Sequence, residues 1–195
     1  ANVPESVKRG QRKSYEAIAN RIFTSNVAPI EILGNVMFGA INIQAALQHP
    51  LSRGSVKIHT TNPFAKPHID PGYLSQNMDL TILRQGFKLI RKIVAQSPLK
   101  DLIDYEESPG SDVQSNDQWE DWIRQNAGTE YHPTGSCSML PRNEGGVVDQ
   151  NLKVYGTSNL RVVDASVPPI SFSAHLMSIT YGIAEIAAEI IARDN

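Results

Sequence analysis

The chain has 195 residues, of which 41% are hydrophobic and 19% charged, and its formal net charge is −2. These values are typical of one ordinary globular domain and argue against a dedicated nucleic-acid surface. No apolar run reaches the length of a membrane span. The single cysteine, Cys137, excludes a disulfide within the chain.

A helical pattern runs through residues 1–26, where Tyr15, Ile18 and Ile22 share one face. Ser14 has the side chain of an N-cap for this segment. The apolar run that follows, at 29–33, is interrupted by one carboxylate.

Residues 38–47 and 55–60 have the composition of strands, and a turn at 49–54 joins them. In the second segment Val56 and Ile58 alternate with polar neighbours, which is typical of a half-buried strand. Three histidines lie in or beside these turns and strands, and we interpret them as structural or exposed: His49, His59 and His68.

Apolar residues recur at steps of three and four between 79 and 96, which predicts a helix that begins at Asp79 and ends before Pro98. Its basic side chains fall largely on the other face, and we expect that face to be solvated.

Ser115 and Gln118 have the spacing of a capping box and predict the start of a second, shorter helix. We expect its two tryptophans, Trp119 and Trp122, to pack in the protein rather than to stack on a substrate.

The segment 131–141 mixes small residues with one imidazole, His132, and is punctuated by proline and glycine. This composition favours a tight turn that carries the imidazole into a cleft. A second imidazole, His175, stands where a long apolar-periodic segment begins, and this segment is predicted to be a helix. The two histidines could act as an acid/base pair if the fold brings them together.

Several motifs follow one another in a fixed order: His132-x-x-Gly135-x-x-x-Met139, Gly145-Gly146-Val147-Val148-Asp149, Val154-Tyr155-Gly156, the run 159–166 and His175. Together they resemble the C-terminal end of the glucose-methanol-choline (GMC) flavin oxidoreductases. That family includes glucose oxidase, aryl-alcohol oxidase and choline dehydrogenase. The dense part of the resemblance covers 131–191, and a looser part covers 50–74.

The resemblance implies an α+β fold in two parts. Residues 1–136 would carry an antiparallel substrate-domain sheet with helices, and residues 137–195 would return to the FAD-binding domain. A strand at 160–163 and the helix after His175 would complete that α/β domain. The family's Gly-x-Gly-x-x-Gly loop does not occur in this sequence. We therefore expect the chain to be the C-terminal piece of a longer, processed enzyme, with the N-terminal FAD-binding chain as its partner.

The resemblance also implies FAD as the cofactor and assigns roles to particular residues. His132 matches the catalytic base, and His175 matches the histidine that hydrogen-bonds the substrate. A glutamate in the region of Glu31 contacts that second histidine in sugar oxidases, and a solvent-facing Glu31 is the equal alternative. The cofactor contacts are Asp164, Ala165 and the backbone of Leu176.

The sequence differs from that of glucose oxidases at two of the positions that precede the catalytic histidine. Glucose oxidases carry an arginine and an asparagine at these positions. This chain has Gly128 and Glu130. The difference argues against glucose and favours a primary alcohol of a small aromatic, furan-like or lactone-like molecule, oxidised to the aldehyde. Oxygen or a quinone as the electron acceptor stays open, as does the compartment, for which secretion is suggested by the family alone.

Three other interpretations stay open at this point. Members of the family act as lyases or cyclases on the same scaffold without net oxidation. A metal site could combine His132, Cys137, Asp164 and His175, although these spacings match no common zinc pattern. The chain could also be an inert structural or binding fragment, since the dinucleotide loop is missing from it.

Overall fold

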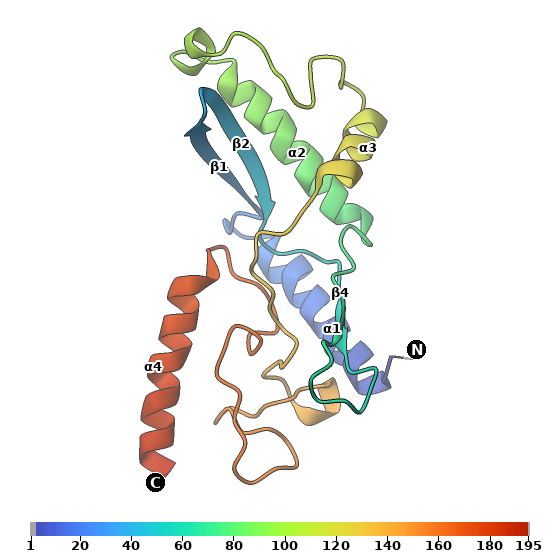
Figure 1. The fold of residues 1–195 in the computed structure, drawn as a ribbon, viewed down its shortest axis with the longest axis vertical. Helices are drawn as coiled ribbons and strands as arrows, with labels where there is room; N and C mark the ends of the chain where they lie inside the picture. The colour runs from blue at the N-terminus through green and yellow to red at the C-terminus, as the bar shows by residue number, and fades with distance from the viewer. Residues whose placement is uncertain (1–2, 195) are drawn as a thin grey trace. The chain divides into compact units, whose positions relative to one another are not determined.

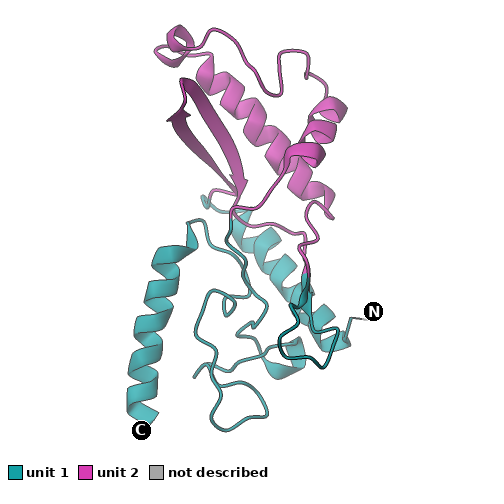
Figure 2. Ribbon diagram, viewed as in Figure 1, with its two compact units in different colours: residues 1–27, 55–68, 131–195 teal, residues 28–54, 69–130 magenta. Residues whose placement is uncertain are grey.

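The structure, a computed structural model, describes residues 3–194. It combines α-helices with short antiparallel strands, which confirms the predicted α+β class. The chain forms two compact units, one of residues 1–27, 55–68 and 131–195, the other of residues 28–54 and 69–130 (Figure 2). The predicted division at 136/137 concerns what each part binds, and it stays a prediction.

The second unit contains a β-hairpin. Its strands β1 (Ile30–Met37) and β2 (Ala40–Leu47) pair antiparallel, with Ile30 opposite Leu47 and Met37 opposite Ala40. Phe38 and Gly39 form the connection, and both have positive φ, at 52° and 82°. Two-residue hairpin turns of type I′ have this left-handed backbone at both positions. The strand predicted from residue 38 therefore begins two residues later.

Helix α2 (Asn77–Val94) lies along this hairpin (Figure 1). The helix begins two residues before Asp79, so the predicted start is wrong. The Asp79 side chain does not cap the helix but binds a neighbouring turn. Asp79 is 1% exposed, and its carboxylate accepts backbone N–H bonds of 2.8 Å from Leu51 and from Ser52. The buried carboxylate thus holds the 49–54 turn against the first turn of α2. A 3₁₀ turn, η2 (Leu99–Leu102), follows the helix.

We expected the basic face of α2 to be solvated, but two of its arginines bind neighbouring segments. Arg84 pairs with Glu120 of α3 (Asn116–Asn126). Arg91 donates to both oxygens of Glu106, at 2.8 and 2.9 Å, and lies over the Trp119 ring at 4.3 Å. Two of the basic side chains therefore join α2 to neighbouring segments instead of facing water alone.

The capping box that opens α3 is confirmed. The Ser115 side chain accepts from the Gln118 backbone N–H, and the Gln118 side chain accepts from the Ser115 N–H. The prediction that the tryptophans pack is also confirmed, since Trp119 is 1% exposed and stacks on Phe87, with Trp122 edge-on to both.

The first unit begins with α1 (Glu5–Ala17), which continues as a π-helical turn, η1 (Ile18–Ile22). Ser14 is a buried residue inside α1, so the N-cap predicted there is wrong; Pro4 occupies the cap position. Helix α1 packs on the short 3₁₀ turn η3 (Arg142–Glu144).

Two predicted strands are shorter in the structure or missing from it. Strand β3 ends at Lys57 instead of residue 60, and Ile58 beyond it is 88% exposed, so the alternating pattern has no buried face there. In the run 160–163, one antiparallel bridge joins Arg161 to Lys153 within the described chain. A strand needs a continuous ladder to a neighbour, and one bridge does not supply it. The other short strand, β4, covers His68–Asp70.

The predicted C-terminal helix is present as α4 (Leu176–Asp194), directly after His175. Its Ala187 packs into a small core with Val148, Leu152 and Val167, all at most 3% exposed. Over residues 3–194, no helix combines the length and the apolar character needed to cross a membrane.

We predict that Gly10→Ala destabilises the protein, although alanine normally favours a helix. A Cβ at this position would lie 2.1 Å from the Glu144 carbonyl oxygen, so α1 must shift away from η3. The expected loss is about 1–3 kcal/mol of unfolding free energy, measured by chemical denaturation. Arg12→Ala, exposed on the same helix, is the control and should change stability by less than about 0.5 kcal/mol. Equal effects of the two variants would contradict the close contact.

We also predict that the last turn of α4 loosens in acid. Lys153 donates a hydrogen bond to the Asp194 carboxylate, and this bond lowers the pKa of the Asp194 carboxyl. The charges of Lys153 and Arg161 lower this pKa further, whereas partial desolvation raises it. A lowered folded pKa means that the contribution is present at neutral pH and is lost as the pH falls through that pKa. The protection of the last-turn amides, which is the observed hydrogen-exchange rate compared with the intrinsic rate at the same pH, should therefore fall in acid and in Asp194→Asn. Glu185→Gln, an exposed change on the same helix, should leave the protection of these amides unchanged. An equal loss of protection in both variants would contradict the role of Asp194 in holding the last turn of α4.

Candidate active site

The loop that carries His132 is joined to the segment before α4 by backbone hydrogen bonds. Cys137 N donates to Ser166 O at 3.0 Å, and Met139 N donates to Val167 O at 2.8 Å. Val167 is 2% exposed in the small core, so the register of these bonds is fixed by burial. The loop and the approach to α4 are therefore held side by side, although some 30 residues separate them in the sequence.

Backbone conformation within this loop is also specific. Gly135 has a φ of +80°, a region that favours glycine, and its carbonyl accepts from the Ser138 hydroxyl at 2.6 Å. Tyr131, directly before His132, also has positive φ, at 58°, which is uncommon for a bulky residue. Such backbone angles are often found near functional sites.

The structure brings the two predicted histidines together. His132 Nε2 lies 3.2 Å from His175 Nδ1, and the rings are 5.0 Å apart between centroids, at an angle of 77°. One nitrogen donates and the other accepts, according to the tautomers. We call these two side chains the histidine pair. His132 is half-buried and His175 is exposed, so the pair is accessible from solvent.

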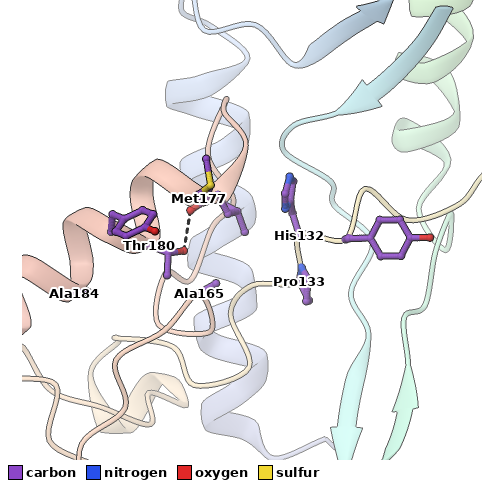
Figure 3. Close-up of a pocket in the computed structure, with 9 residues that line it drawn as sticks. His132, Pro133, Ala165, Met177, Thr180 and Ala184 are labelled. Carbon is purple, nitrogen blue, oxygen red and sulfur yellow. Dashed lines mark hydrogen bonds between the residues drawn. The ribbon is translucent and has the colours of Figure 1, made fainter. Parts of the chain in front are cut away.

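An open cavity of about 480 Å³ lies beside His132. In Figure 3, His132 and Pro133 face Ala165, Met177 and Thr180 across it. Its walls are mainly apolar, and its size is that of small-molecule and cofactor sites. The full lining is Tyr131, His132, Pro133, Ala165, Leu176, Met177, Thr180, Tyr181 and Ala184.

The remaining predicted site residues fall into three places. Ala165 and Leu176 line the cavity. Asp164 is exposed and outside the lining; its Oδ1 accepts from the Ser166 N–H at 2.8 Å and from the Ser166 hydroxyl, so it shapes the turn before α4. Glu31 belongs to the other unit, where its Oε2 accepts from Gln48 Nε2 at 2.9 Å. The roles assigned to all of them stay predictions.

Sequence reasoning missed the part of the lining that comes from the first turns of α4. These residues are Met177, Thr180, Tyr181 and Ala184. They recur at steps of three and four, so they lie on one face of the helix. This spacing is the signal in the sequence that could have indicated them.

The four-residue metal centre considered above lacks geometric support. Within the described residues, no three side chains of His, Cys, Asp or Glu gather closely enough to hold one metal ion.

The sequence matches the family model described as "GMC oxidoreductase" over residues 50–184. The chain belongs to the GMC oxidoreductase family. This GMC chain is 66% identical, over 97% of its length, to "GMC oxidoreductase family protein Mala s 12" of Malassezia sympodialis, of which it covers 31%. It is 34% identical, over 92% of its length, to glucose oxidase 1 of Penicillium expansum, of which it covers 30%. It thus spans about a third of these relatives.

Solved structures of whole flavoenzymes contain the same fold. An FAD-dependent oxidoreductase from Chaetomium thermophilum matches with a TM-score of 0.91 at 28% identity, over 98% of this chain and 32% of that one. A fungal aryl-alcohol oxidase matches with a TM-score of 0.87 at 29% identity, over 97% and 32%. The family and these neighbours are FAD-dependent flavoproteins.

The residues of the cavity fit such a cofactor. A flavin ring is flat and mainly apolar, with a polar edge that accepts hydrogen bonds. The walls beside His132 are apolar, and α4 starts at the cavity with Leu176, where the first backbone N–H groups of a helix have no partner within it. These N–H groups and the positive end of the helix favour electron-rich oxygen atoms.

We predict that Ala165→Leu lowers the flavin content of the purified enzyme, because the larger side chain fills part of the cavity. The measurement is visible flavin absorption per protein. Ala95→Leu, an exposed change at the end of α2, adds the same side chain away from the cavity and should retain the flavin. Normal flavin content in both variants would argue against a cofactor role for this wall.

Proposed function

We propose that the enzyme containing this chain oxidises a small primary alcohol to the aldehyde with FAD. The observation that supports this proposal most strongly is the histidine pair, with ring nitrogens 3.2 Å apart at the edge of an apolar cavity. Alcohol oxidation needs a group that accepts the hydroxyl proton while hydride leaves the adjacent carbon. FAD, when bound, supplies the hydride acceptor.

His132 is the proposed proton acceptor. Its half-buried ring is held by the loop that is hydrogen-bonded to Ser166 and Val167, so its position is set by backbone contacts. An imidazole suits this role because it exchanges protons near neutral pH, and general base catalysis of this kind typically contributes about 10²–10⁴-fold.

His175 is proposed to orient the substrate hydroxyl and to assist the proton transfer. Its Nδ1 lies 3.2 Å from His132 Nε2, so a hydroxyl oxygen that approaches both nitrogens from one side can exchange hydrogen bonds with both rings. The backbone of Leu176 and the residues Asp164 and Ala165 are proposed to hold the cofactor, and Glu31 is proposed as a supporting carboxylate.

A small aromatic, furan-like or lactone-like alcohol is the proposed substrate class. The cavity walls are mainly apolar, which suits an unsaturated ring better than a sugar with many hydroxyls. The positions before His132 are Gly128 and Glu130, neither of which offers the cationic or amide donors expected of a sugar site. The aryl-alcohol oxidase among the structural neighbours acts, by its name, on aromatic alcohols. The comparisons give no support to the lyase or cyclase alternative.

An N-terminal FAD-binding part of the same enzyme is the proposed partner. The chain covers about a third of its relatives, and α4 exposes large apolar side chains, with Met177 at 72%, Tyr181 at 70% and Ile186 at 61%. An exposed apolar face of this kind is typical of an interface.

We predict that His132→Ala slows flavin reduction by about 10²–10⁴-fold while flavin stays bound, because the proton acceptor is removed. Rapid anaerobic mixing with an aromatic primary alcohol measures the reduction rate, and the visible spectrum reports bound flavin. His59→Ala, an exposed histidine away from the cavity lining, is the matched control and should keep the rate. An unchanged rate in His132→Ala would remove this residue from the mechanism.

A further inference from the structure

The loop that carries His132 has a part that is held by backbone hydrogen bonds. Two amides of residues 137–139 donate to the segment that leads into α4, and the Ser138 carbonyl between them accepts from Val147 N at 2.9 Å. Val148, the next residue, is fully buried in the small core. Ser138 is therefore joined to two other segments of the chain at once.

The Ser138 side chain extends this held part toward the turn that follows His132. Its hydroxyl donates to the Gly135 carbonyl oxygen at 2.6 Å. Gly135 lies three residues after His132 and has a φ of +80°. A serine hydroxyl that binds the carbonyl three residues earlier stabilises a local backbone turn. We propose that Ser138 is a positioning residue, whose hydroxyl holds the turn that places the His132 imidazole against His175.

The contact between the two rings is sensitive to such positioning. The distance of 3.2 Å from His132 Nε2 to His175 Nδ1 is at the upper end of the usual range for a hydrogen bond, so a small outward movement breaks it. Helix α4, which begins directly after His175, packs through Ala187 on Val148. One small core thus locates both sides of the contact, and it locates the His132 side through Ser138.

The consequence for the reaction rests on the proposed function. Without the hydroxyl, His132 would remain in the loop but would not be held where it accepts the proton. We expect the rate constant for flavin reduction at saturating alcohol to fall, because a misplaced group slows the chemical step. Flavin content and the alcohol concentration that half-saturates reduction should change little, since the α4 wall of the cavity is unaltered.

The test uses the complete enzyme and rapid anaerobic mixing with an aromatic primary alcohol. Ser138→Ala should slow flavin reduction by about 10–100-fold. Ser138→Thr keeps a hydroxyl at this position and should keep most of the rate. Ser136→Ala is the matched control, because it removes the hydroxyl of an exposed serine in the same loop, and it should leave the rate unchanged. A full rate in Ser138→Ala, where His132→Ala is slow, would overturn the proposal.

A double variant separates positioning from general support of the fold. Once His132→Ala has removed the imidazole, Ser138 has nothing left to position, so the addition of Ser138→Ala should slow the reaction no further. An equal slowing by Ser138→Ala with and without the imidazole would show that Ser138 supports the fold as a whole, and it would overturn the proposal.

A second measurement does not depend on the reaction. In a crystal structure of the complete Ser138→Ala enzyme, we expect the two ring nitrogens to lie farther apart than a hydrogen bond allows, with the backbone bonds of residues 137–139 kept. Ring nitrogens that remain 3.2 Å apart would overturn the positioning role. A displaced imidazole, together with full rates in both Ser138→Ala and His132→Ala, would support the positioning role and contradict the proposed base.

Discussion

The candidate active site depends on two backbone hydrogen bonds, from Cys137 N to Ser166 O and from Met139 N to Val167 O. Each contributes only about 0.5–1.5 kcal/mol to stability. Their importance is geometric, because they bring the His132 loop beside the segment that leads into α4. Val167 is buried with Val148 and Leu152, and this burial prevents the segments from slipping past one another. The histidine pair and the cavity wall at Ala165 follow from that register.

Local sequence signals predicted the helices well. The capping box at Ser115, the periodicity of α2 and the start of α4 depend on residues a few positions apart, and the structure confirms all three. Signals that depend on distant partners failed. Nothing near Asp79 in the sequence indicates that its carboxylate binds the 49–54 turn, and the apolar run 160–163 looks like a strand whether or not a neighbouring strand is present.

The candidate site was predictable to a similar extent. Motifs around His132 and His175 indicated which side chains to consider, but 43 residues separate them, and only the fold establishes their contact. The α4 residues that line the cavity were missed because a single helix carries two apolar faces, one toward the core and one toward the cavity. The assignment of Glu31 depends on the resemblance alone and stays a prediction.

The proposed role of this chain is to supply the proton-accepting half of an FAD-dependent alcohol oxidation. The most direct test is the visible absorption spectrum of the complete enzyme, before and after the addition of an aromatic primary alcohol without oxygen. We predict flavin bands that bleach on addition of the alcohol. Flavin bands that persist with every aromatic, furan-like and lactone-like primary alcohol would contradict the proposed reaction, and a complete enzyme without flavin bands would contradict the cofactor as well.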